Sequence, residues 1–228
     1  MRTPALLWLF VAASVVAAGG ELESARDRQD RPALEAIVAK AGSAAEKAPG
    51  DAARQYQAAL ASSYLAEVAL ELRDKALAQR AAEAGIRTAE RAVSLKPDKA
   101  EYHRVLGTLC GQVIPANVLA GLSYGKRARD AVNKALELDP KSSGAWLARG
   151  VGNYYLPAAF GGGPALAVAD FRKALQLNPA SADAWLWLGL GLRKEKNNAE
   201  ARKAFTKALQ LNPSRVWAKQ QLEKTPPQ

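Results

Sequence analysis

Apolar residues recur every three or four positions along most of the chain, and polar or proline-containing turns separate these stretches. This spacing predicts amphipathic helices, and no segment alternates as a strand would. Four of the predicted helices end in the pattern Leu-x-Pro, at 95–97, 138–140, 177–179 and 211–213. The last two patterns are 34 residues apart, so the sequence predicts helical hairpins that repeat along an all-α chain.

The stretch between Pro179 and Pro213 shows how one repeat would pack. The expected packing positions are Trp185, Leu188, Gly189 and Leu192 in the first helix, and Ala201, Phe205 and Ala208 in the second. Small residues let two antiparallel helices approach closely, and the large aromatic residues fill the space between them. This pattern resembles the tetratricopeptide repeat at nearly every signature position.

Two earlier repeats carry the same pattern with extra residues between their helices. The repeat from Pro140 to Pro179 is 39 residues long, and we expect its extra residues in an inter-helix turn at 154–164. The repeat from Pro97 to Pro140 is 43 residues long, and we expect its extra residues in the equivalent turn, around 113–117. Residues 50–97 resemble the repeat more weakly. The proline-rich turn followed by an alanine-rich helix is also similar to the regulator of microtubule dynamics group, a tetratricopeptide-like family.

The resemblance implies an all-α, right-handed superhelical solenoid of about four hairpins with a capping helix at each end. We expect one long helix over 21–48, alanine-rich helices over 52–72 and 75–95, and three hairpins over 98–213. The corresponding domain division is 1–18, 19–97, 98–213 and 214–228.

The C-terminal segment is expected to close the solenoid. Ser214 can cap a last helix from Arg215 to about Lys224, in which Trp217 and Leu222 cover the exposed end of the stack. Residues 225–228 are expected to form a frayed tail.

Residues 1–18 have the pattern of a secretory signal peptide. Arg2 precedes an apolar run from about Ala5 to Ala18, and small residues at Val16-x-Ala18 fit cleavage after Ala18. The run is short for a membrane span, and the alternative is an uncleaved N-terminal anchor. We therefore expect a periplasmic or secreted protein, and for that reason the resemblance to microtubule regulators implies no cytoskeletal role.

The chain is strongly basic, with a formal net charge of +10. Its cations are interspersed with alanine and glutamate at helical spacing, which is typical of solvated helix faces. The charge also favours an acidic partner. Basic residues do not interleave with aromatic ones, so we expect no binding to nucleic acid.

Candidate catalytic chemistry is sparse. Cys110 is the only cysteine and His103 the only histidine, and both fall at expected helix-packing positions. The glycine-rich segment 160–164 lacks the Lys-Ser/Thr of a nucleotide loop, so we interpret it as a turn that needs positive φ angles. No nucleophile stands beside a base, and we expect neither an enzyme nor a cofactor or metal site.

The resemblance instead places a binding groove on the first helices of the three clear hairpins. The implied groove residues are Arg104, Thr108, Gln112, Leu147, Val151, Tyr154, Tyr155, Leu186, Leu190, Arg193 and Lys194. This set is apolar in the middle, with tyrosines beside it and cations at both ends. It would suit an amphipathic helix or an extended peptide with an acidic terminus.

Three alternatives stay open for the groove. The turn at 156–164 or the helix at 21–48 could cover the apolar residues. The groove could instead close over a small hydrophobic or acidic ligand for a transporter, in a cavity bordered by Tyr154, Tyr155, Phe160 and Leu190. The chain could also associate with itself through the same surface. If the groove is open, Leu147→Glu with Leu190→Glu abolishes binding and preserves helicity.

Overall fold

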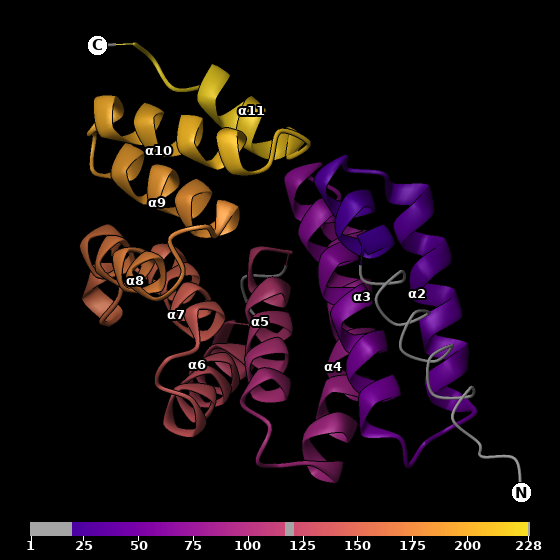
Figure 1. The fold of residues 1–228 in the computed structure, drawn as a ribbon. Coiled ribbons are helices and arrows are strands. Elements are labelled where there is room, and N and C mark those ends of the chain that lie inside the picture. Colours follow the sequence, from indigo (N-terminus) through magenta and orange to yellow (C-terminus); the bar gives the residue numbers. More distant parts are fainter. Residues whose placement is uncertain (1–19, 117–120, 228) are drawn as a thin grey trace, which may run out of the picture.

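The computed structural model describes residues 20–116 and 121–227, and all regular structure in these ranges is helical (Figure 1). Residues 20–27 form a first short helical segment. The elements that follow are α2 (Arg31–Glu46), α3 (Ala52–Glu71), α4 (Lys75–Leu95), α5 (Ala100–Ala116), α6 (Gly121–Leu138), α7 (Ser143–Tyr155), the 3₁₀ turn η2 (Ala158–Phe160), α8 (Pro164–Leu177), α9 (Ala182–Lys194), α10 (Asn198–Leu211) and α11 (Val216–Glu223). The predicted signal peptide lies outside the described residues.

Short polar side chains fix where several of these helices begin. Asp51, Asp74, Ser142, Ser181 and Asn197 each accept a hydrogen bond from a backbone N–H in the first turn of the following helix. These N–H groups have no partner inside the helix, so the caps stabilise each start.

The helices pair in chain order into four hairpins, α3–α4, α5–α6, α7–α8 and α9–α10. The first helices of the hairpins also touch one another, α3 with α5, α5 with α7 and α7 with α9, so they form an inner row. The helix α2 packs on α3 at one end, and α11 packs on α10 at the other. The expected all-α solenoid with capping helices is therefore confirmed.

Glycine at the crossing points lets the helices of a hairpin approach closely. A Cβ atom on Gly189 would lie 2.6 Å from Cε1 of the buried Phe205, and one on Gly150 would lie 2.5 Å from Cε1 of Phe171. These contacts are shorter than carbon atoms tolerate, so the small residues at these positions are required by packing.

The prediction of one helix over 21–48 is wrong. Gln29 adopts a left-handed conformation with φ of 55°, and Asp30 caps a new helix by accepting from the N–H of Ala33. Pro32 in the first turn has no N–H to lose, which favours a helix start at this point. The chain therefore turns after residues 20–27 before α2 begins.

The two inserts have different structures. The first one lengthens helices: α5 continues to Ala116 with Pro115 inside it, and Val113 is fully buried, so the expected turn around 113–117 is wrong over its helical part. The second is a turn, as expected, and Gly161 and Gly163 have φ angles of 83° and 112°.

The C-terminal helix begins without the expected serine cap. Arg215 occupies the capping position of α11 and makes no capping bond from its side chain, which reaches another part of the molecule. Trp217 and Leu222 pack against the last two hairpins, as expected. Thr225 is buried, and its carbonyl accepts from Arg202 at 2.5 Å, so the predicted frayed tail is wrong at this residue.

The solenoid curves until its two ends meet, with α11 beside the end of α3 (Figure 1). No helix in the described ranges is long and apolar enough to span a bilayer.

Candidate functional site

The predicted groove residues all lie on α5, α7 and α9, which are three of the four helices in the inner row. The side chains on this inner face therefore decide what the concave side can bind. The first of these three helices, α5, contributes polar side chains that are already hydrogen-bonded within the protein.

Arg104 forms an ion pair with Glu101 on the same helix, through bonds of 2.5 and 2.7 Å. Glu101 also accepts from the hydroxyl of Tyr56 on α3 at 3.0 Å. The Thr108 hydroxyl donates to the Arg104 carbonyl. Gln112 donates from Nε2 to the Ser63 carbonyl of α3 at 3.1 Å and accepts at Oε1 from the Ser63 hydroxyl at 3.2 Å. This part of the inner face is polar and held in place by neighbouring helices.

The apolar middle of the predicted groove is mostly internal core. Leu186 is 1% exposed and Leu190 is 4% exposed, whereas Leu147 and Val151 are partly buried. The expectation that all four present an open apolar strip is therefore wrong. These residues join one core cluster with Trp217 of α11.

Four aromatic rings gather where α7, α9 and α11 meet. Trp187 lies edge-on to Tyr154 at 5.7 Å between ring centroids and to Trp217 at 5.4 Å, and Tyr154 contacts Tyr155 at 5.1 Å. Such edge-to-face contacts fix ring orientation. Tyr155 nevertheless keeps 51% of its surface exposed. Trp187 and Trp217 were not predicted as part of this site, because the contacts of Trp187 with the tyrosines and of Trp217 with Trp187 form only when α7, α9 and α11 pack together.

Tyr155 faces α3 across the inner side of the solenoid. Its partial removal from bulk water, together with Tyr154 and the carboxylates of Glu67 and Glu71, raises the pKa of its phenol to about 12. The hydroxyl therefore stays protonated at neutral pH and can donate a hydrogen bond. Tyr155 is the clearest exposed aromatic group on this face.

The two cations at the end of the predicted groove have structural partners. Arg193 donates to the carbonyl and the side chain of Gln221, at 3.2 and 2.6 Å, and to the hydroxyl of Thr225 at 3.1 Å. Lys194 donates to the Tyr154 carbonyl at 2.6 Å and lies over its ring. The expectation of free cations for an acidic peptide terminus is wrong here, because these side chains hold α11 and the end of α7.

A network of charged side chains closes the solenoid. Arg215 contacts Glu71 at 2.5 Å and Glu67 at 2.6 Å, and Arg26 contacts Asp183 at 2.8 Å. These pairs join α3 and residues 20–27 to the C-terminal helices. We call this group the clasp, and its members are Arg26, Asp27, Glu67, Glu71, Asp183 and Arg215.

Burial strongly affects the charges in the clasp. Desolvation raises the pKa of Glu67 to about 7 despite the nearby Arg215 and Arg26 guanidinium groups. Desolvation also acts on Asp183, but Arg26 and Arg215 together lower the pKa of its carboxyl. The clasp holds four carboxylates and two arginines, so the inner face does not share the strong positive charge of the whole chain.

Residues 20–27 partly match the alternative in which the N-terminal segment covers the groove. Arg26 reaches Asp183 on α9, and Asp27 accepts from Asn212 at 2.7 Å. The turn at 156–164 does not take this role, since Phe160 is 72% exposed. A closed ligand cavity bordered by Tyr155, Phe160 and Leu190 is also not formed, because the first two are exposed and Leu190 is buried.

The two reactive residue types serve packing. Cys110 is fully buried, which raises the pKa of its thiol to about 11. The ring of His103 is buried, and its Nε2 lies 2.8 Å from the Pro97 carbonyl oxygen. Within the described residues, no group of His, Cys, Asp and Glu side chains is arranged to hold a metal ion.

The repeat geometry matches that of a known class of helical proteins. Residues 158–216 match the tetratricopeptide repeat family. That segment covers α8, α9 and α10, where the sequence pattern is also clearest. No curated protein matches the chain.

A solved tetratricopeptide structure resembles most of this chain. A thermophilic tetratricopeptide protein from Thermus thermophilus is 19% identical with a TM-score of 0.63, covering 85% of this chain and 91% of its own. The protein MamA is 18% identical with a TM-score of 0.44, covering 82% of this chain and 92% of its own. At these identities the first likeness supports the tetratricopeptide fold alone.

Proposed function

We propose that this protein is an exported, non-catalytic tetratricopeptide scaffold that binds a segment of a partner protein along its inner face. Solenoids of this kind offer an extended concave surface for such binding. The partner contact is centred on Tyr155, at the junction of α7, α9 and α11.

The exposed ring of Tyr155 is the observation that carries this proposal. Tyr154 and Trp187 contact the ring from the side, so a partner would not have to immobilise a flexible group. Rigid aromatic residues dominate binding energies at protein interfaces, because they bury a large area at little cost in conformational entropy.

The neighbouring polar groups favour an extended peptide rather than an apolar helix. Gln112 and Arg104 are partly buried and fixed by hydrogen bonds, and Leu186 and Leu190 of the expected apolar strip are internal. A peptide backbone could exchange hydrogen bonds with such groups while one side chain stacks on Tyr155. Export rests on the signal-like pattern of residues 1–18.

The binding proposal is tested with peptides selected from a displayed random library on the wild-type protein. Their affinities are then measured for Tyr155→Ala and for Phe160→Ala. Phe160 is a matched control because it is more exposed than Tyr155, lies at the end of η2 and makes no ring contact among the described residues.

Tyr155→Ala should weaken binding by about tenfold or more, as expected for an interface anchor, while Phe160→Ala leaves it unchanged. Equal affinities for wild type and Tyr155→Ala would overturn the proposed site.

Export has a separate test, which is the N-terminal residue of the protein purified from its own cells. Cleavage of the signal should leave Gly19 as the first residue, and a chain that still begins at Met1 would contradict signal cleavage.

A further inference from the structure

The segment that contains η2 and the start of α8 presents large apolar side chains to solvent. Phe160 is 72% exposed and Leu166 is 49% exposed, and residues 157–159 are exposed as well. We call residues 157–166 the knob. Soluble proteins seldom leave several apolar side chains uncovered in one place, and where they do, the surface is usually one that another molecule covers.

The knob lies in an uncharged stretch of a strongly charged chain. No charged residue occurs from 150 to 169, although 24% of the whole chain is charged. The next carboxylate along the chain, Asp170, is buried and pairs with Arg149 at 2.6 Å. Protein interfaces use charges to orient the partners and to exclude wrong ones, and the knob offers none for that purpose.

The backbone of the knob is held in one conformation. The Pro157 carbonyl accepts hydrogen bonds from the N–H groups of Phe160 and Gly162, at 2.9 and 3.2 Å. A Cβ atom on Gly162 would clash with the carbonyl oxygen of Leu156, so only glycine permits this close return of the chain. Phe160 therefore stands on an ordered turn, and little conformational entropy is lost when its ring is covered.

The exposed side of α8 changes from apolar to cationic along the helix. Leu166 lies in the first turn, and Arg172 and Lys173 are exposed further along. Within the described part of the chain, neither cation has an ion-pair partner. Lys173 follows Leu166 by seven residues, which is about 10 Å along the helix axis. Helical side chains lean toward the N-terminus, so the lysine stem is directed back toward the knob.

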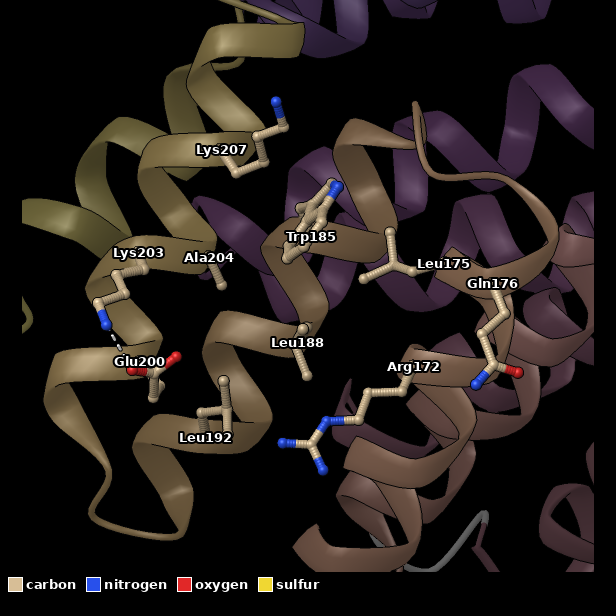
Figure 2. Close-up of a pocket in the computed structure, with 10 residues that line it drawn as sticks. All are labelled: Arg172, Leu175, Gln176, Trp185, Leu188, Leu192, Glu200, Lys203, Ala204 and Lys207. Atoms are coloured by element: carbon tan, nitrogen blue, oxygen red, sulfur yellow. Dashed lines mark hydrogen bonds and ion pairs between the residues drawn. The ribbon is translucent and has the colours of Figure 1, made fainter.

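The pocket between α8 and α10 has no comparable apolar surface. Leu188 and Leu192 of α9 line it, but both are buried core residues. Figure 2 shows Arg172 extending from α8 at the edge of this pocket. On this part of the solenoid, the exposed apolar side chains belong to the knob, and the unpaired cations follow it on the same helix.

We propose that the knob docks the protein on an anionic lipid membrane. Phe160 and Leu166 enter the boundary between head groups and acyl chains, while Arg172 and Lys173 meet the lipid phosphates. Interfacial segments bury apolar side chains about 5–10 Å deep at this boundary, which agrees with the spacing along α8. The formal net charge of +10 attracts the chain to such a surface. A bilayer also accepts an uncharged apolar tip without any specific pairing.

Co-sedimentation with lipid vesicles tests this proposal. The protein used begins at Gly19, so that the apolar run of residues 1–18 cannot itself insert, and the described fold starts at residue 20. One set of vesicles contains equal parts of phosphatidylglycerol and phosphatidylcholine, and the other contains phosphatidylcholine alone. Wild type should bind the anionic vesicles more tightly than the neutral ones.

Two double variants separate the apolar contribution from the charge contribution. The knob variant is Phe160→Ala with Leu166→Ala, and its control is Leu72→Ala with Leu138→Ala, two exposed leucines outside the knob. The charge variant is Arg172→Glu with Lys173→Glu. Its control is Lys75→Glu with Arg80→Glu, which makes the same change in net charge at exposed positions of α4.

The knob variant and the charge variant should each lose about tenfold or more in binding to the anionic vesicles. The leucine control should match wild type, and the α4 control should lose much less than the charge variant. Unchanged binding of the knob variant, or an equal loss in the α4 control, would overturn the proposal by reducing it to general attraction of charge. Wild type that binds no vesicles but forms a dimer that the knob variant does not form would overturn it in favour of a contact between two copies.

The membrane surface and the peptide site can be tested separately. The knob variant should keep wild-type affinity for the peptides that bind at Tyr155, because Phe160 and Leu166 make no ring contact with that residue within the described chain. Loss of both peptide and vesicle binding in the knob variant would overturn the knob as a separate surface.

Discussion

The indole N–H of Trp185 donates a hydrogen bond to the carbonyl oxygen of Pro179 at 2.9 Å. Trp146 makes the same bond to Pro140 at 2.9 Å, and the His103 ring contacts the Pro97 carbonyl at 2.8 Å. In each case the proline closes one hairpin and the ring belongs to the next helix in the chain. The Leu-x-Pro pattern and the ring six residues after its proline therefore act as one joint between successive hairpins.

This joint can be tested by replacing Trp185 with phenylalanine, which keeps an aromatic ring but removes the N–H donor. We expect a loss of about 0.5–1.5 kcal/mol in the free energy of unfolding, measured by urea denaturation. Trp217→Phe is the control, because the Trp217 indole N–H makes no hydrogen bond within the described residues. A loss no larger than in this control would show that the bond contributes little.

The crossing point of the last hairpin gives a second prediction. Gly189→Ala should destabilise the protein by about 1–3 kcal/mol, because the added methyl group would overlap the buried Phe205 ring. Gly152→Ala is the matched change on α7, where the new methyl group meets no atom within 4 Å. It should stabilise by about 0.5–1 kcal/mol through helix propensity. Similar melting temperatures for the two variants would contradict this packing.

Local sequence was sufficient for the hairpins but not for the way the solenoid closes. Trp185, Phe205 and the closing prolines lie as their spacing predicts, because each contacts residues nearby in the chain. The groove prediction failed at Leu186 and Leu190, which belong to a core cluster that also includes Ala218 of α11. The break at Gln29 was visible in principle, since Asp30 and Pro32 together form a helix start signal.

Charged residues were the least predictable from sequence. Arg193 and Lys194 look like a free basic surface, but their partners lie 28 to 40 residues away. Arg215 meets Glu71 across 144 residues, and no periodic pattern connects two positions that far apart. Which cations are free for a partner can therefore be decided only after the chain is folded.

Replacement of Arg215 should show how much the buried ion pairs of the clasp matter for the free energy of unfolding. Arg215→Met leaves Glu67 and Glu71 without their guanidinium partner in a buried site, and we expect a loss of about 3–5 kcal/mol in unfolding free energy. Lys203→Met, which breaks the exposed pair with Glu200, should cost under about 1 kcal/mol. Adding Glu71→Gln to Arg215→Met should restore part of the loss, and its failure to do so would argue against uncompensated charge as the cause.

The clasp also predicts how stability depends on pH. The pKa of Glu67 is raised to about 7 in the folded protein, from an ordinary value near 4.5. Between these values the folded chain holds a proton that the unfolded chain has released, so stability falls as the pH rises through this window. We expect a fall of about 1–3 kcal/mol from this group between pH 5 and pH 8. The lowered pKa of Asp183 acts in the opposite sense, but it does so below its ordinary value of 3.8 and outside this window.

Urea denaturation at pH 5 and pH 8 measures this effect, and Glu67→Gln supplies the control. Glutamine resembles the protonated carboxyl, so the variant should match wild type at pH 5 and be the more stable of the two at pH 8. The difference arises because ionised Glu67 loses hydration inside the clasp that Arg215 and Arg26 do not fully replace. A wild-type protein that is equally stable at both pH values, or that changes in parallel with Glu67→Gln, would show that Glu67 titrates at its ordinary pKa and that the clasp holds it ionised throughout.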